Sequence, residues 1–230
     1  MRKKNLMVFS LVIVFFVAQS CSSKPEETLL KNYFHALALN DNATMSAMAL
    51  EPIALETESW EIVKVTTDKI EPAVLADLSK KELDLKKKLE DHVGPTLDAK
   101  DTVDAAKEEM DSARTGAAKA AAKKKVDDLQ AKYDQTFAEH KDLQRNYNEA
   151  KAAAAREEEI ISFCLGVRDL ANIRDLTGDV HSKEVEVKVK GKTGAAKTYT
   201  LFLRQYLLKD AATNLTYRGQ WKIIKTESAG

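Results

Sequence analysis

The feature that most constrains the fold is a long, charged and alanine-rich run between about residues 73 and 163. No Phe, Trp or Tyr occurs between Trp60 and Tyr133, although large aromatic side chains dominate most hydrophobic cores. Alanine, leucine, lysine and glutamate, which fill the run, are strong helix formers. The run therefore predicts a helical structure that is built differently from the rest of the chain.

Within this run, apolar and small residues recur with the heptad spacing of a coiled coil. In the first half, the inward heptad positions continue without a slip from Leu75 to Ala113, and an equivalent series runs from Val126 to Ala154. When the two series are paired antiparallel, the residue numbers of each pair add to the same total, whose midpoint is Gly116. We therefore predict an antiparallel helical hairpin over residues 73–163 that turns near Gly116.

Gly94 and Pro95 interrupt the first half of the run. Glycine followed by proline is a common helix stop, so one interpretation ends the first helix at Val93. The alternative keeps the helix intact, because both residues occupy outward heptad positions, where water can replace the hydrogen bond that proline cannot donate. The first interpretation would leave residues 116–160 without a partner helix, and the uninterrupted register favours the second, with Gly94-Pro95 as a bend.

One layer of the predicted hairpin pairs two histidines, His92 and His140, beside a layer of Thr96 and Thr136. Polar layers commonly fix the register of a coiled coil at a cost in stability. The second hypothesis is a pH-sensitive joint, because two facing imidazoles resist being protonated together. Two histidines without a further ligand rarely hold a metal, and we expect none here.

The N-terminal segment has the order of a signal peptide, with basic residues at positions 2–4, an apolar stretch, and small residues before Cys21. The apolar stretch of about thirteen residues is shorter than the roughly twenty that a transmembrane helix needs. We expect residues 1–20 to be removed. One interpretation of this segment is an ordinary secreted protein in which Cys21 has no special role.

The other interpretation is a lipid anchor, because the ending Ala18-Gln19-Ser20-Cys21 resembles a bacterial lipobox. This resemblance implies that Cys21 is modified with diacylglycerol, that residues 21–25 form a lipidated tether, and that the membrane is one partner of the chain. Ser22, rather than an aspartate, follows the cysteine. By resemblance to Gram-negative lipoproteins, this implies a location in the bacterial cell envelope, at the outer membrane and facing the periplasm.

Charge and cysteine content narrow the function further. The whole chain has 36 basic and 36 acidic residues, so removal of the basic N-terminal segment leaves an excess of acidic residues. A mildly acidic surface argues against nucleic acid as a partner. Cys164 lies in the apolar stretch "IISFCLGV", where a cysteine is far more often a small core residue than a nucleophile.

The two ends of the chain, residues 26–72 and 164–230, have the patterns of a small α+β body. "EETLLKNYFHALALN" predicts an amphipathic helix, "DNATMSAMAL" a short helix that Asp41 or Asn42 can cap, and "SWEIVKV" a strand. In "KEVEVKVKG", valines alternate with charged residues, which is typical of a sheet with one solvated face. "TYTLFLRQYLL" is apolar on both faces and predicts a central strand covered on both sides, with "GKTGAA" before it and "DAATN" after it as turns.

Two stretches, "LLKNYFHALALND" and the closing "YRGQWKII", resemble the nuclear-transport-factor-2-like superfamily. The resemblance covers roughly half of the chain and implies a cystatin-like cone of helices on a curved antiparallel sheet. It also implies that a short third helix lies around residues 160–170, after the hairpin insert. The fold hosts enzymes, binding modules and dimerisation domains alike.

The sequence contains no group of residues that we interpret as catalytic. Catalytic members of that superfamily would need carboxylates, or a tyrosine and a carboxylate, pointing into the cone, whereas Glu184 and Glu186 alternate with valines as on a solvated face. No metal-ligand spacing or phosphate-binding loop is present. We expect no enzyme activity, no cofactor and no metal.

Two functions remain as hypotheses. The first is a lipid-anchored, non-catalytic envelope protein whose helical hairpin binds another envelope protein, and which can also form a homo-oligomer. The alternative is a small-molecule-binding protein or an enzyme that uses the cone. Its pocket would be lined by aromatic residues that are equally expected in the core, namely Tyr33, Trp60, Tyr199 and Trp221.

Overall fold

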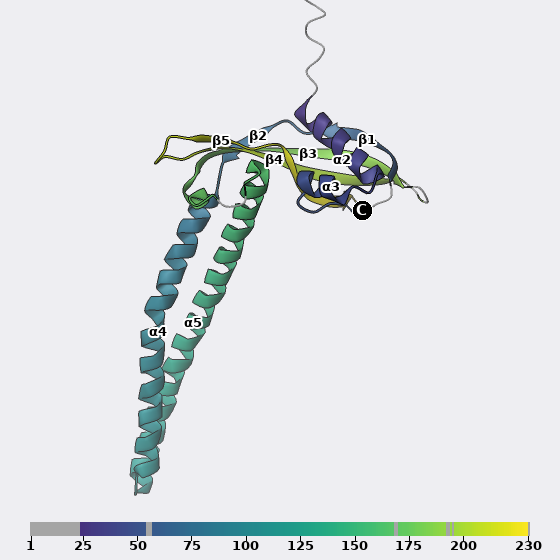
Figure 1. The fold of residues 1–230 in the computed structure, drawn as a ribbon. Helices are drawn as coiled ribbons and strands as arrows, with labels where there is room; N and C mark the ends of the chain where they lie inside the picture. Colours follow the sequence, from purple (N-terminus) through teal and green to yellow (C-terminus); the bar gives the residue numbers. More distant parts are fainter. Residues whose placement is uncertain (1–23, 54–56, 168–169, 192–193, 195, 230) are drawn as a thin grey trace, which may run out of the picture. The chain divides into compact units, whose positions relative to one another are not determined.

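The structure is a computed structural model that describes residues 24–53, 57–167, 170–191, 194 and 196–229 (Figure 1). The fold is α+β, with antiparallel strands and a long antiparallel helical hairpin, as predicted. The chain forms two compact units. The first, which we call the body, contains the described residues up to Ile70, Val180–Gln205 and those from Gly219 onward. The second, the arm unit, contains Glu71–Asp179 and Tyr206–Arg218.

The body combines two short helices with antiparallel strands. Strand β1 pairs with β3, β3 neighbours β4, and β4 pairs with β6. Short β2 adds to β3, and short β5 adds to β4 in the arm unit. The bounds are α2 (Pro25–Ala38), α3 (Asn42–Met48), β1 (Thr57–Val65), β2 (Lys69–Pro72), β3 (Thr177–Gly191), β4 (Lys197–Lys209), β5 (Thr216–Arg218) and β6 (Lys222–Ala229).

The helices of the body form where the sequence predicts them. Pro25 occupies the start of α2, where its missing N–H is not needed. Asp41 caps α3 by accepting a hydrogen bond of 3.0 Å from the backbone N–H of Thr44. This hydrogen bonding, first of all that from the Thr44 side chain, lowers the pKa of Asp41 below its ordinary value. Of the two predicted caps, Asp41 is therefore the one used.

Strand β3 has one solvated face, as its alternation predicts. Val185, Val187 and Val189 are buried. On the other face, the Lys188 ammonium lies 3.6 Å from the Glu61 carboxylate, and that of Lys190 lies 2.9 Å from Glu58. Both pairs join β3 to β1, which adds opposite-charge cross-strand contacts to the ladder.

Strand β4 differs from its prediction. It is central, but it is not covered on both sides along its length. In the body it buries the odd-numbered Tyr199, Leu201 and Leu203, whereas in the arm unit it buries the even-numbered Tyr206 and Leu208. The strand is apolar on both faces because its buried side changes along its length. Part of the predicted "GKTGAA" turn, residues 192, 193 and 195, lies outside the described residues.

The arm unit consists mainly of the hairpin, formed by α4 (Leu75–Ser112) and α5 (Gly116–Leu165) (Figure 1). Pro95 lies inside α4, so the interpretation that ended the first helix at Val93 is wrong. The helix continues because Gly94 and Pro95 are on its exposed side. The side chain of Thr115 caps α5 by accepting a hydrogen bond of 3.2 Å from the Ala118 N–H, which places the turn directly before Gly116.

Helix α5 continues beyond the predicted end of the hairpin. It stops at Gly166, whose φ of 69° gives the left-handed conformation that commonly terminates helices. A separate short helix was expected around residues 160–170. Residues 160–165 are helical, but they form the last turn and a half of α5, so the expectation of a separate helix is wrong for them. A short 3₁₀ helix, η1 (Ile173–Asp175), follows. None of the helices in the described ranges is both long enough and apolar enough to cross a bilayer.

Candidate functional site

The contact between α4 and α5 follows the predicted heptads, which we letter a to g with a and d inward. Every predicted inward residue from Leu75 to Ala113 and from Val126 to Ala154 is buried or half-buried. The rings of His92 and His140 meet, with centroids 5.9 Å apart. The predicted register and the predicted polar layer are therefore both present in the hairpin.

The histidine layer is asymmetric. Nδ1 of His92 lies 3.1 Å from the Thr96 hydroxyl, and that hydroxyl donates to the His92 carbonyl oxygen at 2.8 Å. Nε2 of His92 lies 3.7 Å from the Glu139 carboxylate, whereas Nδ1 of His140 finds no hydrogen-bond partner in the described part of the chain. Those residues also contain no cluster of His, Cys, Asp or Glu that could hold a metal ion. Whether the layer fixes the register or responds to pH stays a prediction.

The two flanks of the hairpin differ. The g positions of both helices lie along one flank, where the Lys125 ammonium approaches the Glu109 carboxylate to 2.5 Å. A shallow groove on the same flank is lined by Leu78, Lys81, Leu85, Asn146, Glu149, Ala150 and Ala153. The e positions, with the neighbouring b positions, make up the opposite flank, which we call the e flank.

The e flank exposes large apolar side chains halfway along the hairpin. Val93 is 43% exposed, Leu97 55% and Phe137 39%. The Phe137 ring is held in place, because it stacks on Tyr133 with centroids 5.6 Å apart and the Lys141 ammonium lies 4.9 Å above it. A fixed, partly exposed aromatic ring beside two exposed aliphatic side chains can bind an apolar partner without first being ordered.

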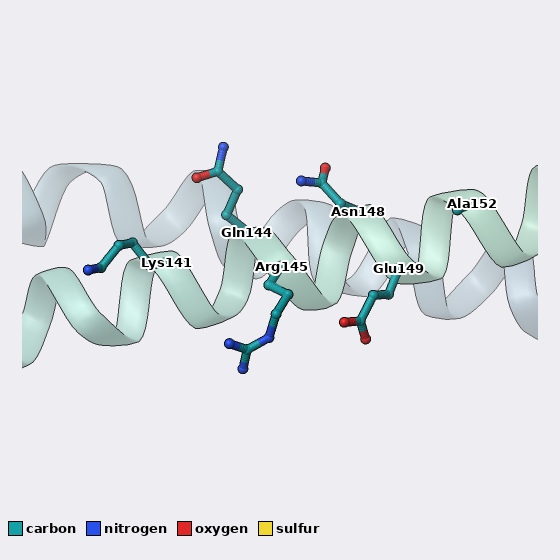
Figure 2. Close-up of a pocket in the computed structure, with 6 residues that line it drawn as sticks. All are labelled: Lys141, Gln144, Arg145, Asn148, Glu149 and Ala152. Atoms are coloured by element: carbon teal, nitrogen blue, oxygen red, sulfur yellow. The ribbon is translucent and has the colours of Figure 1, made fainter.

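Further from the turn, the outer surface of α5 is polar. Figure 2 shows a shallow, open pocket whose lining side chains all come from α5 and extend outward from it. They are Lys141, Gln144, Arg145, Asn148, Glu149 and Ala152. Arg145 is occupied by an ion pair of 3.0 Å with Asp142. This surface has polar groups that can contact a partner, but the pocket is too open to enclose a small-molecule substrate.

The aromatic residues proposed to line a pocket lie in or against the core of the body. Tyr33 is 0% exposed, and Tyr199 is buried in the same cluster, against which Trp60 and Trp221 pack. The Tyr33 hydroxyl accepts a hydrogen bond of 2.8 Å from the Ile53 N–H. Burial raises the pKa of Tyr33, and this hydrogen bond partly opposes the rise. The four side chains are thus brought together by packing.

Sequence reasoning missed a polar cluster around Trp221. The Lys183 ammonium lies 5.1 Å from the Trp221 ring centre and 3.1 Å from the carboxylate of buried Glu26. The His181 ring meets Trp221 edge-on and lies 3.0 Å from the Asp68 carboxylate. Sequence reasoning could not connect His181 with Asp68 and Trp221, because they come from distant segments that no local spacing connects.

A second polar cluster closes the end of the hairpin that is far from its turn. The Tyr206 hydroxyl donates to the buried Glu157 carboxylate at 2.7 Å. Arg174, from η1, contacts Glu82 of α4 at 2.8 Å and Glu158 of α5 at 2.7 Å. Glu158 first, and then Glu82, raises the pKa of Arg174. Arg174 therefore connects the two helices through charge-assisted hydrogen bonds.

The two cysteines of the chain complete the set of predicted residues. Cys164 is completely buried, as expected of a small core residue. Cys21, the predicted lipid-attachment residue, lies outside the described residues. Comparison of the chain with protein-family models, with curated proteins and with solved structures finds no match in any of the three.

Proposed function

We propose that this chain is a non-catalytic protein of the bacterial cell envelope that is anchored through lipid at Cys21 and binds another protein through its helical hairpin. The observation that carries the proposal is the set of exposed apolar side chains on the e flank, Val93, Leu97 and Phe137. Fully burying an exposed side chain of this kind is worth about 1.5–3 kcal/mol, and roughly half of that remains to be gained here, because each of the three is already about half buried. The flank can therefore contribute appreciable binding energy to a partner that covers it.

The alternative function, a small-molecule or catalytic cone, has less support. Tyr33 and Tyr199 are buried, and Trp60 and Trp221 pack against the same core. These aromatic side chains already contribute to packing, which leaves them little surface for a ligand. The proposal that the body is nuclear-transport-factor-2-like rests on its two opening helices and antiparallel strands, and it does not by itself assign a function.

The binding proposal is tested by capture of partners from solubilised envelopes with the full chain as bait. Leu97→Asp places a charge on the e flank, whereas Leu39→Asp makes the same change at a leucine that is 66% exposed at the end of α2. We expect a partner that wild type and Leu39→Asp both retain and that Leu97→Asp loses. Equal capture by all three proteins would contradict the proposed role of the flank.

The anchor is tested by fractionation. Stable attachment of a protein to a bilayer through acyl chains requires more than one chain, and the proposed lipid modification of Cys21 supplies several. Wild type should sediment with membranes and Cys21→Ser should become soluble. The control is Cys164→Ser, which changes the other cysteine of the chain and should leave the distribution unchanged. A Cys21→Ser protein that stays with membranes would refute the lipid anchor.

A further inference from the structure

The charges nearest the apolar centre of the e flank are arranged symmetrically about it. On α4, exposed Lys86 and Glu90 lie between the centre and the open end of the hairpin, which is the end far from the turn. Exposed Lys100 and Asp104 lie at matching distances toward the turn. Lys86 and Asp104 are thus about 27 Å apart at 1.5 Å per residue. The midpoint of each matched pair is residue 95, between Val93 and Leu97.

Helix α5 has the same centre. Lys141 lies on the open-end side of Phe137, and Asp134 lies on the turn side. Because the His92 and His140 rings meet in one layer, residues 95 and 137 lie at the same height in the hairpin. Both helices therefore place opposite charges on the two sides of one point, at equal distances on α4 and within one residue of equal distances on α5.

This arrangement is what a two-fold symmetric contact requires. In such a contact each residue meets the residue of the other copy at the mirrored position. With two hairpins antiparallel, Glu90 faces Lys100 of the second copy, Lys86 faces Asp104, and Asp134 faces Lys141. Each of these pairs combines opposite charges, and the apolar centre meets its own equivalent.

We propose that the e flank binds a second copy of this chain, with the two hairpins antiparallel and centred on Val93, Leu97 and Phe137. The inference rests on the proposed function and names the partner of the same surface. Charge complementarity selects the orientation and the register, while the apolar centre supplies the buried contact.

In the antiparallel contact, α4 faces α4 of the second copy. In a parallel two-fold contact, α4 would face α5 of the second copy instead, and the charges would match less well. The parallel contact would also bring Glu90 near Lys141 and Lys100 near Asp134. However, it would place Asp104 beside Asp127 of the second copy, which is a like-charge contact. It would also leave Lys86 opposite uncharged Gln144 and Asn148. In the antiparallel contact, the four α4 charges nearest the centre, Lys86, Glu90, Lys100 and Asp104, all meet opposite charges. Its like-charge pair, Lys123 with Lys151, lies about 21 Å from the centre, further out than Asp104.

The first test uses the unmodified chain. Full-length protein labelled with ¹⁵N is mixed with unlabelled protein in detergent, treated with a carbodiimide that joins contacting amines and carboxylates, and digested for mass spectrometry. We expect mixed-isotope links that join Glu90 to Lys100, Lys86 to Asp104 and Asp134 to Lys141. Within one hairpin the first two pairs are separated by about 15 Å and 27 Å along α4, so these links report contact between copies. Links between Glu90 and Lys141 of different copies would instead show that the two hairpins pair in parallel, and they would overturn the antiparallel contact.

The second test reverses charges and measures self-association by sedimentation. Glu90→Lys places a positive charge opposite Lys100 of the second copy, and the two-fold symmetry repeats this repulsion at a second place. The variant should therefore weaken self-association by about tenfold or more. Lys100→Glu should do the same. The double variant Glu90→Lys/Lys100→Glu restores opposite charges only in the antiparallel contact, and it should recover the wild-type association. Arg145→Glu, a reversal on the outer surface of α5, is the control and should change little.

Monomeric wild type, or a double variant as weak as the single ones, would overturn the inference. The proposed function would survive that result if Leu97→Asp still lost a captured protein of a different sequence. In that case the e flank would bind another protein and not a second copy. Loss of both effects would refute the role of the flank altogether.

Discussion

The body and the arm unit are built from different kinds of core. In the body, large side chains from segments far apart in the sequence pack together, among them Leu30, Tyr33, Phe34 and Leu201. In the arm unit, the hairpin repeats one layer after another, and many layers contain small or polar residues, namely His92, Thr96, Ala99, Ala106, Thr136, His140 and Ala150.

This difference has consequences for stability. A large buried side chain in the body contacts many others, so its loss leaves a cavity that the rest can fill only partly. A layer of the hairpin buries less apolar surface than a large core side chain of the body, and it contacts mainly the layers directly before and after it. We therefore expect single substitutions to have large effects in the body and small effects in the hairpin. Trp60 and Trp221, the two tryptophans of the chain, both lie in the body, so tryptophan fluorescence reports on the body alone.

The largest effect should come from Phe34→Ala. Phe34 is buried, stacks on Trp60 with centroids 4.6 Å apart, and meets Tyr33 edge-on. Its loss should destabilise the body by about 3–5 kcal/mol, measured by urea unfolding followed by tryptophan fluorescence. Phe137→Ala makes the same change on the exposed flank of the hairpin. At concentrations where the chain is monomeric, it should cost under about 1 kcal/mol by far-ultraviolet circular dichroism. Similar costs for both would contradict the expected difference between a buried position in the core of the body and an exposed position on the flank of the hairpin.

An intermediate effect, of opposite sign, should come from Pro95→Ala. A proline inside a helix costs about 3 kcal/mol, and the greater freedom of the unfolded alanine chain returns roughly 0.4–1 of this. The variant should therefore stabilise α4 by about 2 kcal/mol, seen as slower hydrogen exchange of the amides around residue 95.

The matched control is Pro25→Ala at the start of α2, where proline costs the helix nothing. It should leave exchange in α2 unchanged or slightly faster. If Pro95→Ala did not slow exchange in α4, the proline would not destabilise the helix, which would mean that other contacts compensate for its missing hydrogen bond.

The smallest effect should be the pH dependence of the helix caps. The pKa of Asp41 is lowered in the folded protein, chiefly by its hydrogen bond with the Thr44 side chain. A lowered folded pKa contributes stability above the unfolded aspartate value of about 3.9, and this contribution is lost as the pH falls through the folded pKa. The stability difference between wild type and Asp41→Ala should therefore shrink below about pH 4.

Thr115 provides the comparison in the arm unit, because its hydroxyl caps α5 and does not titrate in this range. The difference between wild type and Thr115→Ala, about 0.5–2 kcal/mol, should stay constant with pH. Thermal melts between pH 2 and 7 would measure both. If the difference for Asp41→Ala also stayed constant, the Asp41 carboxylate would have the same pKa in the folded and the unfolded protein.

The hairpin could be predicted from the sequence alone, because a coiled coil repeats locally and its contacts depend on spacing. The heptads from Leu75 to Ala113 and from Val126 to Ala154 predicted the register, the histidine layer and the turn before Gly116, and they also predicted that Pro95 stays inside a helix. The valine alternation of β3 likewise predicted its buried face. In each case one helix or one strand contains the whole pattern.

The features that join distant segments emerged only from the tertiary structure. The buried side of β4 changes between Leu203 and Tyr206 because the strand leaves one compact unit and enters the other, and no local pattern separates this from a strand covered on both faces. Arg174 bridges α4 and α5 through Glu82 and Glu158. The e flank became a candidate site only once exposure was known, because the sequence cannot say which apolar side chains remain in water after the two helices pair.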